Sequence, residues 1–372
     1  MMLRKFGHTL FVLALMLAGA CFTACNDNEP AEEGNQELVQ MCASIASRNA
    51  VESRVALGEI IHWGKHEFIE NDKINVDAWH FRDLDGVRKT ETRFFDSQEM
   101  TYDGSSWVYT PVKYWPNVVD EKLAVCAYVM NVTTSEKHCE ITKNSETGYS
   151  MTFTDCGFLD DVLVAPLTEV EQGETVNLKF YHIVSRVKVR VRYVLENADD
   201  AEDNYITLAG VTQVGQSQSG TFTGFSKDAN GNYVANWEDV VYDGMLIADR
   251  TPYKINANEG FTDLYAMEFF QIPYESPVYD NNGKANYSFF DVFVTFSGED
   301  PNKYPEERDA AGHKYNAIKY NQSVAFVHQP GKTTTFDITI NGKDIVVDVS
   351  VDGDPRWSGA GTGAGEDLVV DF

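Results

Sequence analysis

The feature that most constrains this chain is its hydrophobic period, which alternates at every second residue in short runs and nowhere holds a 3.6-residue repeat. The clearest run near the start places Val39, Met41, Ala43 and Ile45 on one side of an extended segment. Such short alternating runs, cut by turn residues, are typical of sandwiches and barrels. The sequence therefore predicts an all-β protein with few, short helices.

Turn residues punctuate the rest of the chain in the same way. Asp103-Gly104-Ser105-Ser106 and Asn341-Gly342 each suit a hairpin turn, because these residue types tolerate the backbone conformations that tight turns need. We expect strands within residues 39–45, 73–79, 100–102, 107–112, 123–129, 149–153, 162–165, 176–180, 183–193, 221–225, 269–272, 289–296, 323–327 and 335–351.

Residues 1–24 have the pattern of a lipoprotein signal peptide. Arg4 and Lys5 precede an apolar run over residues 10–20, which is too short to cross a bilayer as a permanent helix. We therefore expect export of the chain and removal of this segment.

A cysteine follows the apolar run directly. Cys25 is followed by the polar residues 26–30, as expected for a lipidated cysteine at the start of a flexible tether, and we predict lipidation there. Cys21 is the alternative, but Phe22 after it does not suit a soluble tether. Acyl chains contribute about 0.8 kcal/mol per buried CH₂, so they would hold the protein on a membrane without a spanning helix.

Composition divides the remainder into a tether and two domains. Residues 25–37 are acidic and polar and are expected to form the tether, and Gln172-Gly173-Glu174 is a plausible domain boundary. We expect one β-sandwich domain over residues 38–173 and a second over residues 174–372.

The charge of the chain excludes one class of partner. The net charge is −27, and loss of residues 1–24, which carry two basic residues and no acid, would make it −29. Such a strongly acidic protein repels nucleic acid and suits a hydrated cell surface. We therefore expect no DNA or RNA partner.

The other cysteines show no motif. Cys42, Cys126, Cys139 and Cys156 include no CxxC pair and no metal-ligand spacing. Export permits disulfides, but the spacing assigns none, and scattered cysteines in a chain of this length are more often buried apolar residues.

Candidate metal sites are weak. His62 and His66 would share a metal on a helix, but on a strand they lie about 13 Å apart. Asp228 opens a segment like a calcium loop, but Glu238 falls one place short of the closing position, and a polar turn explains it better. We expect no metal site and no cofactor.

Aromatic residues offer a possible glycan platform. Trp107, Tyr109, Tyr114 and Trp115 could stack on sugars, although core packing of strand aromatics explains them more simply. The chain has acids throughout, so no catalytic carboxylate pair can be selected, and no nucleophile motif occurs. We therefore expect no enzyme activity.

Several segments, taken in order, resemble the fimbrillin family. The first four lie in the amino-terminal half and the last two correspond to strands of the family's second domain. They are Phe68-Ile69-Glu70-Asn71-Asp72-Lys73-Ile74-Asn75-Val76, Tyr102-Asp103-Gly104 with Trp107, Tyr114-Trp115-Pro116, residues 123–128, residues 178–187 and Phe270-Gln271-Ile272-Pro273. The resemblance covers most of residues 38–350.

The resemblance implies a fold and a way of assembly. It implies two transthyretin-like β-sandwiches in tandem, exported as a lipoprotein and assembled with other pilin subunits into type V pili at the outer-membrane surface, the fimbrium, where they contribute to adhesion. In polymerising members an Arg-specific protease removes the amino-terminal strand, which here would be the strand of Val39, Met41, Ala43 and Ile45. The matching cut is at Arg48, with Arg54 as the alternative.

The resemblance also implies that a strand of a neighbouring subunit fills the vacated groove. Leu368, Val369, Val370 and Phe372, behind a Gly-rich stretch, are the preferred donor residues, with residues 345–351 as the alternative. Residues 357–365 are the least similar to the family, so the shaft, tip and anchor roles all stay open. A monomeric surface lipoprotein that binds a glycan or a host protein is the other reading.

Overall fold

The computed structural model describes residues 38–45, 68–84, 87–115, 121–130, 138–154, 161–195, 204–264, 267–279, 283–342, 344–352 and 366–367. These residues are almost entirely β, which confirms the predicted fold class. The described ranges contain no α-helix, and therefore none with the length and apolarity needed to cross a membrane. A 3-10 helix, η3, spans Pro301–Lys303.

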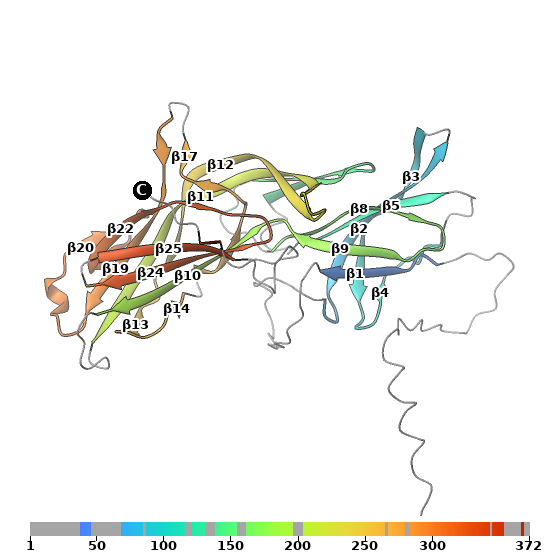
Figure 1. The fold of residues 1–372 in the computed structure, drawn as a ribbon. Coiled ribbons are helices and arrows are strands. Elements are labelled where there is room, and N and C mark those ends of the chain that lie inside the picture. The colour runs from blue at the N-terminus through green and yellow to red at the C-terminus, as the bar shows by residue number, and fades with distance from the viewer. Residues whose placement is uncertain are drawn as a thin grey trace, which may run out of the picture. The chain divides into compact units, whose positions relative to one another are not determined.

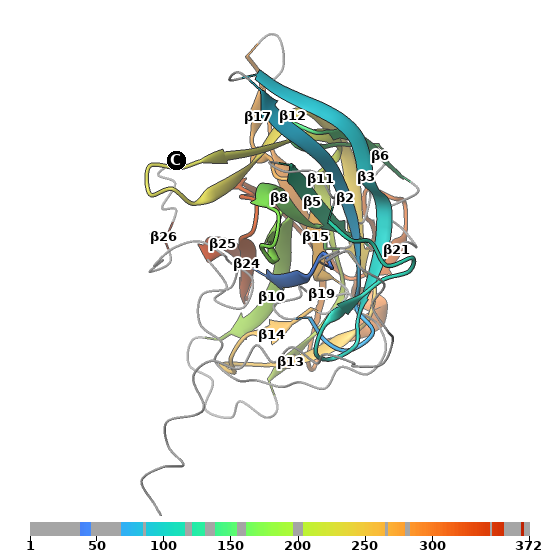
Figure 2. The same ribbon diagram turned by 90° about the vertical axis from the view of Figure 1, so that its right-hand side faces the viewer.

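The first sheet has seven strands in the order β1-β9-β8-β5-β2-β3-β4. Its edge strand β1 runs beside β9 in Figure 1. Bulges interrupt the pairing of β2 and β3, which appear in Figure 2 as long, bent neighbours. The strands are β1 (Met41–Ile45), β2 (Lys73–Leu84), β3 (Val87–Tyr102), β4 (Trp107–Val108), β5 (Lys122–Val129), β8 (Leu163–Glu171) and β9 (Val176–His182).

The second sheet has the order β14-β10-β24-β25-β26, with β15 also paired to β10. The predicted hairpin around Asn341-Gly342 is confirmed as β24 and β25, which pair over their whole length. The strands are β10 (Ser185–Val194), β14 (Thr262–Asp263), β15 (Phe269–Gln271), β24 (Thr333–Asn341), β25 (Asp344–Asp352) and β26 (Glu366–Asp367).

The third sheet has the order β22-β19-β11-β7-β6, with β12 and β13 also paired to β11. Its central strand β11 is 23 residues long and runs beside β12 (Figure 1). The strands are β6 (Cys139–Asn144), β7 (Gly148–Phe153), β11 (Tyr205–Lys227), β12 (Tyr233–Asp249), β13 (Tyr253–Asn256), β19 (Ser288–Phe296) and β22 (Ile318–Val324).

Three two-stranded ribbons complete the described structure. They pair β16 (Glu275–Ser276) with β23 (Phe326–Val327), β17 (Val278–Tyr279) with β18 (Ala285–Asn286), and β20 (Glu306–Arg308) with β21 (Lys314–Asn316).

The sheets enclose three main apolar cores. The first lies on the inner face of the first sheet and includes Trp107 and Phe180. The second lies between the second and third sheets and includes Phe290 and Phe336. The third joins the outer face of the first sheet, through Trp79, to β7, β11 and β12. Each core gains its stability from burial of alternate strand residues.

The change from the first sheet to the second falls later than the predicted boundary at Gly173. β9 follows Gly173 but pairs with β1 and β8, so it belongs to the first sheet, and β10 is the first strand of the second. β11 pairs with β7 near one end and with β19 near the other. One sheet therefore serves two cores, and the division into domains 38–173 and 174–372 stays a prediction.

Candidate strand-binding site

The amino-terminal strand β1 lies at the edge of the first sheet and pairs with β9 in parallel. The register places Met41 opposite Val176 and Ile45 opposite Phe180. Parallel pairing joins segments that are distant in sequence, and here about 130 residues separate the two strands. β1 is therefore held by tertiary contacts and not by a hairpin turn.

The four predicted strand residues face the first core. Val39, Met41 and Ile45 are 1%, 7% and 8% exposed, and Ala43 packs against the same core while half-buried. Full burial of a Val, Met or Ile side chain stabilises a fold by about 1.5–3 kcal/mol. Removing β1 would therefore expose a large apolar surface.

The surface under β1 is formed mainly by aromatic rings and by β9. Phe180 of β9 packs edge-on against Phe68, with ring centroids 5.4 Å apart, and Phe68 packs against Trp107 at 5.0 Å. Val176 and Leu178 complete the β9 side. We call these five residues, together with the residues of the 109–114 segment that bond β1, the β1 site.

The start of β1 is also bonded from the opposite edge of the sheet. The Tyr109 hydroxyl donates to the carbonyls of Val39 (3.1 Å) and Lys113 (3.2 Å), and the Val39 amide donates to the Lys113 carbonyl (3.4 Å). Leu38 forms a bridge with Tyr114. Burial raises the pKa of Tyr109, so its hydroxyl keeps its proton at neutral pH. β1 thus connects the two edges of the first sheet.

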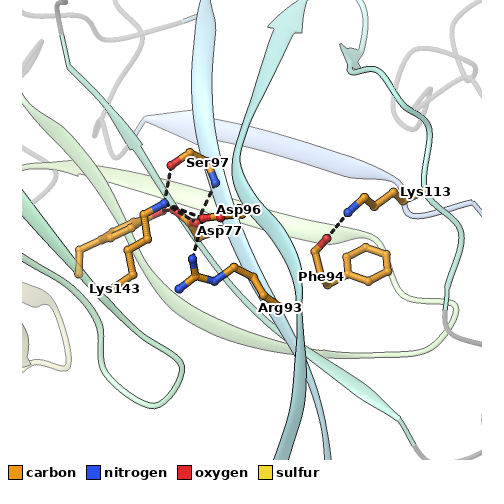
Figure 3. A network of polar contacts seen from close by, with 8 residues as sticks. Asp77, Arg93, Phe94, Asp96, Ser97, Lys113 and Lys143 are labelled. Atoms are coloured by element: carbon orange, nitrogen blue, oxygen red, sulfur yellow. Dashed lines mark hydrogen bonds and ion pairs between the residues drawn. The ribbon is translucent and has the colours of Figure 1, made fainter.

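Lys113 anchors this segment to β3. Its Nζ donates to the Phe94 carbonyl and lies 5.3 Å and 5.2 Å from the ring centres of Phe94 and Phe95, as Figure 3 shows for Phe94. The 109–114 segment therefore has a fixed position against the sheet, from which it bonds β1.

A buried carboxylate supports β2 and β3 nearby. Asp77 has no exposed surface and accepts hydrogen bonds from Lys143 (2.9 Å), Tyr149 (2.8 Å) and the Ser97 amide (2.8 Å). Figure 3 shows Lys143 reaching Asp77, Asp96 and Ser97, and Arg93 bonded to Asp96. Burial lowers the pKa of Lys143, but the bonds to Asp77 and Asp96 outweigh it, and the net shift is upward. The lysine therefore stays charged and neutralises the buried acid.

Other predicted site residues lie outside the described residues. These are the lipidation residue Cys25 and its alternative Cys21, the processing residues Arg48 and Arg54, the histidines His62 and His66, and the donor residues Leu368, Val369, Val370 and Phe372. Their roles stay predictions.

The aromatic residues considered as a glycan platform are mostly core residues. Trp107 and Trp115 are 7% and 3% exposed, and Tyr109 packs half-buried against the same core. Tyr114 is exposed. The structure therefore favours core packing for three of the four.

The segment that resembled a calcium loop is a turn between β11 and β12. Asp228 accepts hydrogen bonds at 2.8 Å from the amides of Asn230 and Asn232, and these bonds lower its pKa.

Cys126 is fully buried, and burial raises the pKa of its thiol to about 12. The Cys126 thiol therefore stays protonated in the core and acts as a buried apolar residue.

Sequence reasoning missed the residues that hold β1 from the far edge. The Tyr109 hydroxyl donates to the backbone carbonyl of Val39, and the backbone carbonyl of Lys113 accepts from the Val39 amide, so the main chain supplies one side of each bond and leaves no residue pattern. The nearest signal was the aromatic and proline content of residues 107–115. The strand that we expected over residues 107–112 pairs as β4 only at Trp107–Val108.

This geometry defines a class of protein: an all-β protein whose first sheet is completed by a short amino-terminal strand. The model of one family, described as fimbrillin-like, matches residues 64–353. The chain belongs to this family. No curated protein matches it.

Solved structures of fimbrial and cell adhesion proteins are similar to this chain. A fimbrial protein from Bacteroides vulgatus is 14% identical, with 84% of this chain and 99% of that chain covered and a TM-score of 0.52. A putative cell adhesion protein from Bacteroides ovatus is 13% identical, covering 91% and 99%, with a TM-score of 0.43. One from Bacteroides uniformis is 12% identical, covering 86% and 98%, with a TM-score of 0.44. At 14% identity, the similarity to the Bacteroides vulgatus protein shows a shared fold and nothing about function.

Proposed function

We propose that this protein is a structural subunit of a cell-surface fimbria of the type V pilus class, and that it contributes to adhesion. Membership of the fimbrillin-like family supports a pilus or adhesion subunit at the cell surface, with other pilin subunits as partners, and favours a structural role over catalysis. The outer membrane is the expected site, with a lipid on Cys25 as the anchor.

Assembly proceeds by donor-strand exchange after removal of β1. The observation that supports this step is that β1 is short and lies at a sheet edge, and yet it buries Met41 and Ile45 in the first core, with Val39 just before it buried there too. A cut after Arg48, by an Arg-specific protease, would separate β1 from the rest of the chain. The exposed edge of β9 and the β1 site would then need another strand, because unpaired edges promote edge-to-edge pairing.

The test is to treat the purified chain with an Arg-specific protease and to follow its size by gel filtration. Arg48→Ala and Arg54→Ala identify the cut, and deletion of residues 366–372 tests the preferred donor. We expect polymers that need both the cut at Arg48 and the tail. A cut chain that stays monomeric would exclude this mechanism and favour a monomeric surface lipoprotein or a tip or anchor subunit.

Lipidation is tested separately. Mass spectrometry of protein extracted from membranes should find an acylated Cys25, and Cys25→Ala should move the protein to the soluble fraction. Acyl on Cys21 or an intact signal peptide would refute this assignment.

A further inference from the structure

One lysine on the outer face of β9 has no acidic partner in the described structure. Lys179 lies opposite Ser44 of β1 in the parallel register, and its side chain is exposed. Lys73, Lys122, Lys143, Lys314 and Lys319 each pair with a carboxylate, whereas Lys179, like Lys227 and Lys254, pairs with none of the described acids. An exposed ammonium next to the strand position is therefore available for a charged side chain on whichever strand occupies the β1 site.

An aromatic cluster lies beside this lysine. Lys179 Nζ lies 5.5 Å from the ring centre of Tyr181, and the Tyr181 ring lies 5.7 Å from Phe225 and 5.3 Å from Tyr233. Lys227 lies 5.1 Å from the Tyr233 ring. The three rings come from β9, β11 and β12 and are half-buried. The attraction between the ammonium and the Tyr181 ring favours this placement of the side chain, so less conformational entropy is lost when the ammonium pairs.

The resident strand gives this lysine nothing to pair with. Along Met41-Cys42-Ala43-Ser44-Ile45, the residue opposite Lys179 is the neutral Ser44. The predicted donor Leu368-Val369-Val370-Asp371-Phe372 has the same apolar alternation, with Asp371 three residues after the first apolar residue. Placed parallel to β9 with Leu368 in the position of Met41, it puts Val370 in the place of Ala43 and Phe372 in the place of Ile45. Asp371 then takes the place of Ser44, opposite Lys179.

The alternative donor has an acid at the same place. Ile345-Val346-Val347-Asp348-Val349 repeats the pattern, but these residues already pair with β24 throughout. Glu366 and Asp367, directly before the 368–372 segment, pair with β25 at two positions only, so charge and pairing together favour the 368–372 segment as the occupant.

We propose that Lys179 selects the strand that enters the β1 site, by pairing with Asp371 of a second copy of this chain and so fixing the register of that strand. This inference rests on the proposed exchange of strands. A slip of two residues would move Asp371 to the place of Cys42, opposite Asn177, and lose the ion pair. A slip of one residue would turn the apolar side chains away from the core. The lysine thus distinguishes the registers that the apolar pattern alone leaves possible.

The same contact favours exchange over return of the resident strand. Opposite-charge pairs on neighbouring strands contribute about 0.2–1 kcal/mol, which corresponds to up to ~5-fold in affinity, and the resident Ser44 cannot form one. An exposed pair is weakened by salt, so the preference falls as ionic strength rises.

The test measures binding of labelled peptides to the full chain after treatment with the Arg-specific protease. The peptide of residues 364–372 is compared with versions carrying Asp371→Ser and Asp371→Lys. The acceptors are the parent, Lys179→Met, which keeps an apolar stem on Tyr181, Lys179→Glu, and Lys254→Glu as a control. Lys254 lies 4.3 Å from the Tyr205 ring, on the third sheet.

We expect Asp371→Ser and Lys179→Met each to weaken binding about 3-fold and Asp371→Lys to weaken it about 10-fold. Lys179→Glu with the Asp371→Lys peptide should recover the parent affinity, and Lys254→Glu should change nothing. Binding of the parent peptide with no effect of either charge would refute the role of Lys179 while leaving strand exchange intact. No binding of any peptide to the cut chain would refute strand exchange itself, and the role of Lys179 with it.

Discussion

Two strands of this molecule, β1 in the first sheet and β25 in the second, are held in different ways. The first sheet ends in β1, five residues long, whose inward side chains are at most 8% exposed except at Ala43. Near the end of the second sheet, β25 is nine residues long and pairs along its whole length with β24 and at two positions with β26. Its Ile345, Val347 and Val349 nevertheless stay half-buried. The deeper burial thus belongs to the strand with the weaker backbone attachment.

This difference distinguishes a strand that is joined to its neighbour by a hairpin turn from a strand that is held by tertiary contacts, which burial alone would not do. β25 is joined to β24 by the Asn341-Gly342 turn and belongs to the fold whatever covers its outer edge. β1 depends on side-chain burial and on bonds to β9 and Tyr109. A strand held in that way can be exchanged for another of the same pattern, whereas a hairpin strand cannot leave without unpairing its sheet.

The largest expected effect comes from the ring beneath β1. Phe180→Ala should lower the free energy of unfolding by about 3–5 kcal/mol, because it deletes a fully buried ring that packs on Phe68. Phe336→Ala in the second core should cost a similar amount. Only Phe180→Ala should speed hydrogen exchange at the amides of β1, measured by mass spectrometry. Equal exchange in the two variants would show that β1 is not held chiefly by its own core.

Two ion pairs give the next contrast between the regions. Lys143→Met leaves Asp77 buried without its cation and should cost about 3 kcal/mol in urea unfolding. Arg190→Met breaks the ion pair with Asp337. The Arg190 and Asp337 side chains are 36% and 18% exposed, so the loss should cost less than about 1 kcal/mol. Asp77→Asn combined with Lys143→Met should recover part of the loss. Equal costs for the two single variants would mean that burial does not decide the strength of these pairs.

Acid should destabilise the second core through His328. His328 is buried against Tyr274, Phe326 and Phe336, its Nδ1 bonds Thr334 at 2.8 Å, and burial lowers its pKa to about 3. The unfolded chain binds this proton below about pH 6.5 and the folded chain does not, so stability falls as pH drops from 6.5 toward 3. The contribution is about 1.4 kcal/mol per pH unit.

The variant His328→Phe isolates that contribution. The difference in unfolding free energy between parent and variant, measured by urea at pH 7 and pH 5, should shift in favour of the variant by about 2 kcal/mol. A difference that does not change with pH would mean that His328 takes up its proton in the folded state.

The sequence pattern predicted which residues of a strand face the core better than it predicted which strands pair. Alternation identified β1 and the inward residues Val187, Val189 and Val191 of β10, since each face meets a different environment. The same pattern could not show that β1 pairs with β9, because pairing over so long a separation depends on the whole fold. Hairpin turns were foreseen because their residue types are local.

The length of β11 was missed for a different reason. We expected a strand at residues 221–225, whereas β11 spans Tyr205–Lys227. Its middle contains Gln213, Gln216 and Ser217, which are buried although polar. A buried polar stretch reads as a loop in any hydrophobic pattern, so only the structure joins the two halves of the strand. The site was foreseen in part: the strand β1 was predicted from its alternation, whereas its bonds to Tyr109 and Lys113 were not.

The smallest expected effect tests the far end of β1. Tyr109→Phe removes the hydroxyl that donates to the carbonyls of Val39 and Lys113 but keeps the ring that packs at 5.4 Å on Phe95. The cost should be about 0.5–1.5 kcal/mol, the net value of a hydrogen bond between neutral groups. Because the bond ends on β1, the loss should appear as faster hydrogen exchange at β1 and faster release of β1 after the Arg-specific cut, with little change in global unfolding. Tyr114→Phe is the matched control, since that ring is 48% exposed and its hydroxyl bonds no described residue. If Tyr109→Phe lowers global stability as much as it loosens β1, the strand is as integral to its sheet as β25, and the contrast between the two strands fails.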